Sequence, residues 1–129
     1  MSLTVSPTLL EQAQAGDIQS NDFLACIQSS LPYAWQLIEA LAARLSQTST
    51  SFVDNQTPPP DEQARGQLLR MLASDAMRNA VEDHFGVKLA FQNCHRVALF
   101  RKEQLDQTYE TFISPRSQIL NQSPELVDC

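Results

Sequence analysis

The stretch VKLAFQNCHRVALF, residues 87–100, decides between two fold classes for this chain. On each side of Asn93-Cys94 its apolar residues alternate with other residues, and this strand period predicts a β-hairpin with a tight turn. Asn-Cys is a poor pair for such a turn, because the second position normally holds glycine. The alternative makes Asn93 the N-cap of a helix with Cys94, Ala98 and Leu105 on one side. We favour the hairpin, which gives an α+β fold, over the all-α bundle.

The hairpin interpretation assigns a face to each side chain of the first strand, because neighbouring residues of a strand point to opposite faces. In both interpretations a helix follows from about Arg101 to Ile113, and Ser114-Pro115 ends it. Residues 114–129 then form a partly flexible C-terminal tail. The core-facing set of the first strand is Val87, Leu89 and Phe91, and the exposed set is Lys88, Ala90 and Gln92.

The segment from Ser20 onward carries the strongest helical signal of the chain. Its apolar positions from Leu24 to Leu45 recur at intervals of three and four residues, which is the helical period. Pro32 interrupts this pattern, because an interior proline removes a hydrogen bond and clashes with the preceding turn. The pattern therefore predicts two helices, or one kinked helix, over about 21–47, with Ser30 able to cap the second.

Capping signals enclose two further helices. Ser6-Pro7 and Gly16 bound a short one, because serine caps, proline suits the first turn and glycine takes the left-handed terminal conformation. Pro60 and Gly86 bound a longer one, whose first turn holds two acids near the positive end of the helix dipole. Its expected buried face consists of Leu69, Leu72, Ala73, Ala76, Ala80 and Val81.

The stretch SQTSTSFVDNQTPPP, residues 46–60, predicts an internal loop with a stiff polyproline end. Phe52 and Val53 attach this Ser/Thr/Pro-rich loop to the body. It is too short to mark a domain boundary, and the chain shows no internal repeat, so residues 1–129 are expected to form a single domain. We therefore expect a mainly α domain of four to five helices with a small hairpin.

Composition and charge exclude several classes of protein. The chain has 129 residues, 43% of them hydrophobic, and 9 Lys+Arg against 15 Asp+Glu, a formal net charge of −6. These values are typical of an acidic, soluble globular domain and exclude a collagen-like or disordered chain. No apolar stretch approaches the roughly 18 residues that span a bilayer. Three widely spaced cysteines without a CxxC pair predict free thiols and a cytoplasmic location.

His84, Cys94 and His95 are the candidate reactive residues. A Cys-His nucleophile needs the imidazole within about 3 Å of the sulfur, but adjacent residues such as Cys94 and His95 point apart. No paired spacing typical of metal ligands occurs either. A buried cysteine with two surface histidines is the simpler interpretation, so we predict no catalytic residue, no metal site and no cofactor, and a Cys/His enzyme is the least favoured function.

A basic stretch over residues 88–102 supplies the alternative function. Its cations are interleaved with phenylalanines, an arrangement that holds phosphate groups and stacks bases in proteins that bind single-stranded nucleic acid. The hairpin sends Phe91 to the core, however, and the acidic balance of the chain opposes a polyanion. A binder of small anions or nucleic acid would use Lys88, Arg96, Arg101 and Lys102.

Tyr33 and Trp35 are the candidate residues for protein interaction. A large aromatic side chain left exposed on a helix would anchor a partner, whereas a buried Trp35 would belong to the core. The chain contains no Walker loop, GxGxxG, HExxH or GxSxG motif. By elimination, the predicted function is that of a non-enzymatic cytosolic accessory, assembly or regulatory protein, which binds a protein partner or associates with itself as a homodimer.

Overall fold

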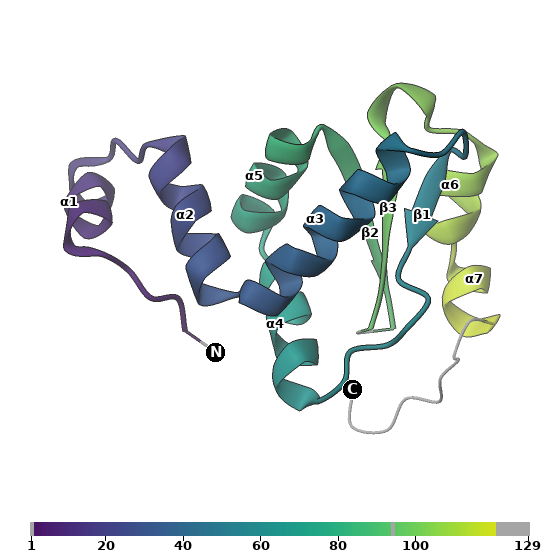
Figure 1. Cartoon of the computed structure of the whole chain (residues 1–129), viewed down its shortest axis with the longest axis horizontal. Helices are drawn as coiled ribbons and strands as arrows, with labels where there is room; N and C mark the ends of the chain where they lie inside the picture. The colour runs from purple at the N-terminus through teal and green to yellow at the C-terminus, as the bar shows by residue number, and fades with distance from the viewer. Residues whose placement is uncertain (1, 94, 121–129) are drawn as a thin grey trace.

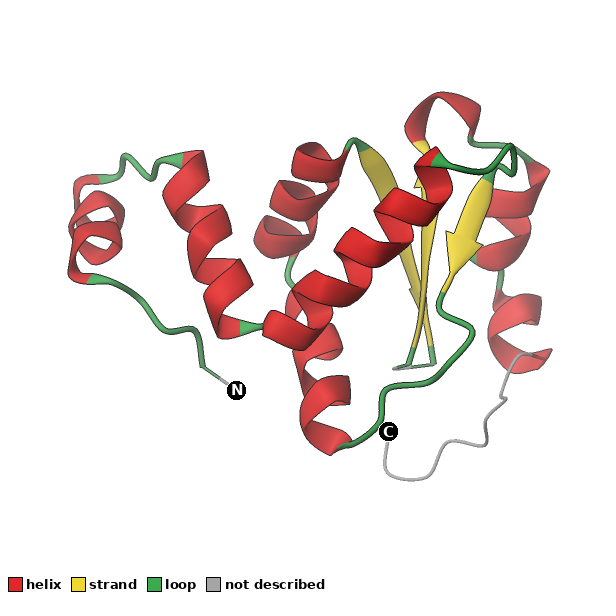
Figure 2. Cartoon of the chain, viewed as in Figure 1, coloured by secondary structure: helices red, strands yellow, loops and turns green. Residues whose placement is uncertain are grey.

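The computed structural model describes residues 2–93 and 95–120. Figures 1 and 2 show a small antiparallel sheet with helices on both of its faces. Over these residues the elements are α1 (Pro7–Ala15), α2 (Ser20–Ser30), α3 (Pro32–Ser46), β1 (Phe52–Asp54), α4 (Glu62–Leu72), α5 (Asp75–Phe85), β2 (Val87–Gln92), β3 (Arg96–Arg101), the 3₁₀ turn η1 (Lys102–Gln104), α6 (Gln107–Phe112) and α7 (Pro115–Leu120). The α+β class is confirmed, with seven α-helices in the described part of the chain instead of four to five.

The predicted hairpin is formed by β2 and β3, which pair antiparallel. Because Gln92 lies opposite Arg96, three residues connect the strands instead of the tight two-residue turn that we expected. Asn93 has a φ of +55°, in the left-handed region that asparagine tolerates better than most residues.

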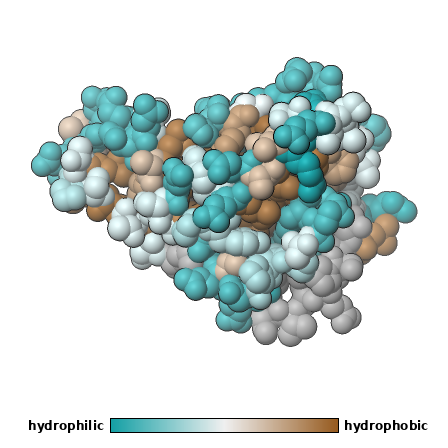
Figure 3. All heavy atoms as spheres, viewed as in Figure 1, coloured by the Kyte–Doolittle hydropathy of each residue, from teal (hydrophilic) through white to brown (hydrophobic). Residues whose placement is uncertain are grey.

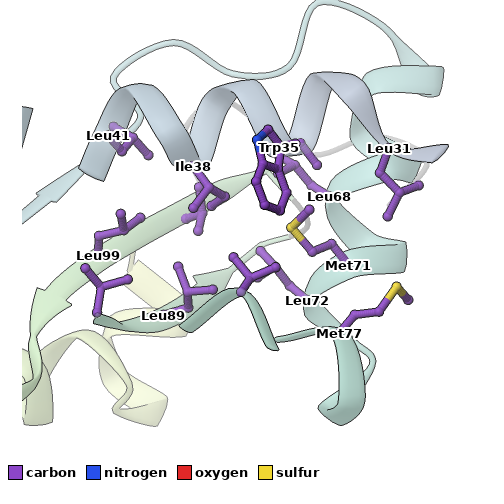
Figure 4. Close-up of a cluster of buried hydrophobic side chains, with 14 of the residues drawn as sticks. Leu31, Trp35, Ile38, Leu41, Leu68, Met71, Leu72, Met77, Leu89 and Leu99 are labelled. Atoms are coloured by element: carbon purple, nitrogen blue, oxygen red, sulfur yellow. The ribbon is translucent and has the colours of Figure 1, made fainter. Parts of the chain in front are cut away.

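The first face of the sheet carries the main hydrophobic core (Figure 4). Leu89 of β2 and Leu99 of β3 pack there against α3, α4 and α5, and Phe91 is partly buried on the same face. The expected inward orientation of Val87, Leu89 and Phe91 is therefore confirmed. The helices contribute Leu31, Trp35, Ile38, Leu41, Leu68, Met71, Leu72 and Met77.

The second face of the sheet is also covered, which contradicts the expected exposure of the other side chains of β2. Ala90 is 8% exposed and Gln92 3% exposed, because α6 and α7 lie over this face. Phe100 is fully buried there, with its ring 5.7 Å from that of Phe112 of α6. Lys88 is half-buried. In a sheet that is covered on both faces, the odd-numbered and the even-numbered residues of a strand both face apolar surroundings. The even-numbered residues of β2 are therefore not consistently polar.

The break between α2 and α3 follows the two-helix interpretation of residues 21–47. Pro32 stands in the first turn of α3, where a missing N–H costs no intrahelical bond. The expected cap by Ser30 is wrong, because Ser30 is the last residue of α2 and its Oγ accepts a hydrogen bond from the Thr4 N–H at 2.8 Å. Leu31 occupies the N-cap position of α3.

The single helix expected between Pro60 and Gly86 is in fact two helices, α4 and α5. The Ser74 hydroxyl accepts a hydrogen bond from Met77 N–H and so begins α5, and Asp61 caps α4 in the same way. The expected single buried face does not form: Leu69 is 40% exposed, and Ala73 and Ala76 are exposed as well. Gly86 ends α5 as predicted, with a φ of +68°.

The loop at residues 46–60 contains a strand that the sequence analysis missed. β1 pairs antiparallel with β3, placing Phe52 opposite Phe100, and the sheet order is β1-β3-β2. The helix expected over 101–113 is wrong: η1 and α6 replace it, because the Asp106 carboxylate caps α6 at Thr108 N–H. Residues 121–129 of the predicted tail lie outside the described residues.

The N-terminal helices α1 and α2 lie at one end of the molecule, with α2 against α3 and α5 (Figure 1). Ser6 caps α1, and Gly16 ends it with a φ of +74°, as predicted. Apolar atoms show between polar ones over these helices in Figure 3, and Val5, Leu10 and Ile18 are each about half exposed. Within the described residues, no helix has the length and apolar character needed to cross a membrane.

Candidate functional site

Two of the four predicted basic residues hold β1 and its flanking loop in place. Arg96 Nε and Nη2 donate to Asp54 Oδ2 at 2.8 and 2.6 Å, joining β3 to β1. Arg101 Nη2 donates to the carbonyl oxygens of Leu45 and Thr48, each at 2.7 Å. Both guanidinium groups therefore have structural partners inside the fold.

The other two basic residues form looser ion pairs. Lys102 Nζ lies 3.4 Å from Asp83 Oδ1, and Lys88 Nζ lies 3.7 Å from Glu82 Oε2. Strand alternation sends Lys88 and Arg96 to the second face of the sheet and Arg101 to the first. The three basic residues on strands are therefore divided between the two faces, and Lys102 follows β3 in η1.

The two predicted interaction aromatics lie mostly inside the fold. Trp35 is 4% exposed, with its ring centroid 5.4 Å from His84 and 5.3 Å from Phe85. Its buried Nε1–H has no hydrogen-bond partner among the described residues. Tyr33 is half-buried, and burial together with the negative charge of Asp61 raises the pKa of its phenol. Trp35 is a core residue in this arrangement.

The predicted reactive residues are not brought into one cluster. The ring of the exposed His84 lies against Trp35 at a tilt of 39°. His95 is 5% exposed, with its Nδ1 2.6 Å from the Asn93 carbonyl oxygen. Cys94 lies outside the described residues. Residues 2–93 and 95–120 contain no group of three or more His, Cys, Asp or Glu side chains arranged to hold a metal ion.

A buried polar cluster fastens α7 to the hairpin, and the sequence analysis missed it. Gln92 Nε2 donates to the Phe112 carbonyl oxygen at 2.7 Å and to Ser117 Oγ at 2.8 Å. Gln118 Nε2 bonds to Asn93 Oδ1. These bonds place α6 and α7 over the second face of the sheet. The only signal of them in the sequence was the polar residue Gln92 within an otherwise apolar strand.

The groove beside β2 is the surface feature that best fits a binding role. It has a volume of about 410 Å³, and four consecutive residues of β2, Lys88–Phe91, line it. Since side chains of a strand alternate between faces, only the edge of the strand is adjacent to all four. Leu72 and Arg78 line the groove from α4 and α5, and Tyr109 and Ile113 line it from the α6 region.

The backbone of β2 turns unpaired polar groups toward this groove. Val97 and Arg101 of β3 bond toward the β1 side, so the residues of β3 that bond to β2 are the even-numbered ones. Leu89 and Phe91 of β2 consequently point their N–H and C=O groups away from β3. Glu82 Oε2 accepts the Leu89 N–H at 2.8 Å, which confirms this direction. Among the described residues, the Phe91 N–H and the Leu89 and Phe91 carbonyl groups have no partner.

A second pocket, of about 310 Å³, lies between β1 and α6. Phe52, Arg96 and Phe112 line it, with Arg96 Cζ 5.0 Å above the Phe112 ring. The Arg96 guanidinium already binds Asp54 there. The cation of this pocket is therefore used inside the fold, and the other polar residues of its lining are Gln107, Thr108, Thr111 and Ser117.

Fold and groove together define a small α+β domain whose antiparallel sheet has an open edge at β2. The family model described as NucS shadow ORF, whose label begins with the letters KH, matches residues 1–129. The chain belongs to the NucS shadow ORF family. No curated protein and no solved structure matches it significantly.

Proposed function

We propose that this chain is a non-enzymatic accessory protein that binds another protein in the groove beside β2. The observation that carries the proposal is the unpaired edge of β2, with Phe91 N–H and C=O groups at the floor of a partly apolar groove. An open strand edge is a template for pairing with another polypeptide. The three widely spaced cysteines fit a reducing compartment, and we expect this activity in the cytoplasm.

Nucleic-acid binding is the second candidate, and the label of the family model favours it. The letters KH are the usual abbreviation for a class of RNA-binding domain in which a GXXG loop clamps the nucleotide backbone. The glycines of this chain, Gly16, Gly66 and Gly86, are too far apart to form that loop. The turn between α4 and α5 holds no glycine, and the side chain of Asp75 beside it is 84% exposed. Without that glycine-rich loop the turn offers the nucleotide backbone no clamp, and so we favour a protein partner.

Site-specific photo-crosslinking in cells that carry the native gene tests the proposal. A photoreactive phenylalanine analogue replaces Ile113, which lines the groove and is 51% exposed, or Leu10 of α1, which is 50% exposed. We expect a discrete protein adduct from position 113 and none of the same mass from position 10. An adduct of twice the mass of the chain identifies a second copy as the partner. Equal adduct patterns from both positions contradict the proposal.

A further inference from the structure

We propose that the groove beside β2 takes an extended, acidic segment of a partner protein, which joins the sheet as a fourth strand. This inference rests on the proposed function and names the chemistry of the partner segment. Three features of the groove carry it: the direction of the free backbone groups, the charge of the lining and the distribution of apolar side chains.

The free backbone groups of β2 match the hydrogen bonds of an added strand. Two carbonyl acceptors, on Leu89 and Phe91, and one donor, the Phe91 N–H, point into the groove. A polypeptide strand satisfies all three, whether it runs parallel or antiparallel to β2. The floor over Lys88–Phe91 is about 13 Å long, which is enough for about four residues of the added strand.

The charged side chains that line the groove are both cations, on a protein whose net charge is −6. Arg78 and Lys88 are its charged residues, and no carboxylate is among the lining side chains. Arg78 is paired with Asp75 at 2.6 Å, but the 3.7 Å between Lys88 Nζ and Glu82 Oε2 exceeds a hydrogen-bond distance. The Lys88 side chain is also 37% exposed, so its ammonium group can bind a second carboxylate from a partner.

Apolar side chains flank the floor on both sides. Leu72 lies on the side of α4 and α5, and Tyr109 and Ile113 lie on the side of α6. Successive residues of an added strand point alternately to these two sides. A segment in which apolar and acidic residues alternate therefore presents apolar groups to Leu72 on the side of α4 and α5, and carboxylates to Lys88 on the α6 side.

A nucleic acid satisfies this groove less well than a peptide. The phosphodiester backbone offers acceptors and no N–H donors, so among the groups of a nucleic acid only bases and 2′-hydroxyls could bond to the carbonyl groups of Leu89 and Phe91. A polar group that loses water without gaining a partner is unfavourable. A polypeptide strand carries donors and acceptors at the same spacing as β2, and this match favours a polypeptide over a polynucleotide.

Binding of a designed peptide to the full chain tests the inference. The probe is fluorescein-labelled Val-Glu-Val-Glu-Val-Glu-Val, followed by fluorescence anisotropy, and the comparison peptide has lysine in place of each glutamate. We expect saturable binding of the first peptide and none of the second. N-methylation of consecutive central residues removes the donors of the probe without changing its charge, and we expect it to abolish binding.

Amide hydrogen exchange reports whether the peptide joins the sheet. Peptide binding should slow exchange of the Phe91 N–H, which is unpaired in the free chain, at least about tenfold. The Ala90 N–H is the internal control, because it already points toward β3 and its exchange should change much less. Binding of the peptide without protection of Phe91 overturns the strand-addition inference.

A matched pair of variants tests the charge argument. Lys88→Gln should weaken binding of the glutamate peptide about fivefold, whereas Lys102→Gln should leave it unchanged. The two lysine side chains are 37% and 41% exposed and each is paired with a carboxylate, but only Lys88 lines the groove. Equal effects of the two substitutions contradict the inference.

The remaining outcomes separate this inference from the proposed function. If position 113 crosslinks a protein but the glutamate peptide does not bind, the acidic-strand inference fails and the proposed function stands. If both experiments fail, the proposed function fails as well. Binding of a labelled oligouridine that is lost in Lys88→Gln overturns the inference in favour of nucleic acid. Without added peptide, exchange of the Phe91 N–H could slow as the concentration of the chain rises. That result identifies a second copy of the chain as the occupant of the groove, and it also overturns the inference.

Discussion

Replacing Asp54 with asparagine should destabilise the fold by about 2 kcal/mol. The Asp54 side chain is 8% exposed and accepts two hydrogen bonds from Arg96, and its other oxygen accepts one from Gln56. Breaking a fully buried ion pair costs roughly 3–5 kcal/mol, and a charge-assisted hydrogen bond contributes about 1.5–3 kcal/mol. Arg96 is 28% exposed, so water partly replaces the lost carboxylate, and the lower part of this range applies.

Thermal unfolding followed by circular dichroism measures this effect. A loss of about 2 kcal/mol lowers the Tm of a domain of this size by about 6–8 °C. Asp83→Asn is the control, because the Asp83 side chain is 81% exposed and its pair with Lys102 should contribute less than about 1 kcal/mol. The Asp54→Asn/Arg96→Gln double variant should be more stable than the sum of the single losses predicts. If Asp54→Asn is no more destabilising than Asp83→Asn, the pair does not hold β1 against β3.

Three further predictions concern the core, the backbone and the pH dependence. Phe112→Ala should cost about 3 kcal/mol in a denaturant titration, because its buried ring covers the second face of the sheet. Gly86→Ala should destabilise by about 1 kcal/mol, since its φ of +68° disfavours a side chain, whereas Gly66→Ala within α4 should stabilise by up to about 1 kcal/mol; equal shifts of Tm would refute this. Burial raises the pKa of Tyr33 above the ordinary 10.0, so the folded chain holds this proton more tightly and should lose stability as pH rises above that value. Asp61→Asn should lower this pKa in an ultraviolet titration without bringing it down to 10.0.

The helix boundaries that depend on local hydrogen bonds were readable from the sequence. Ser6 and Gly16 bound α1, and Gly86 ends α5, because caps and left-handed terminal residues act within a few positions of the helix. Ser74 is a cap of the same kind, but the apolar period runs across it toward Val81. The period alone therefore predicted one helix where the serine separates two.

The pairing of β1 with β3 was not readable from either segment alone. Phe52 and Val53 were expected only to attach a loop to the body, and three residues are too few to show a strand period. The strand forms because Phe52 pairs with Phe100 across the sheet and the Asp54 carboxylate binds the Arg96 guanidinium. Both partners lie more than forty positions away in the chain.

The sequence by itself determined the α+β class, the β2–β3 hairpin and the inward face of Val87, Leu89 and Phe91. Each of these follows from alternation or capping over a few neighbouring residues, where the chain's own geometry sets the outcome. Only the tertiary structure decided which basic side chains line the groove and which bind other groups within the fold. Lys88 lines the groove, whereas Arg96 and Arg101 bind distant groups. That division depends on long-range packing, because it requires α5, β2 and α6 to meet at one edge of the sheet.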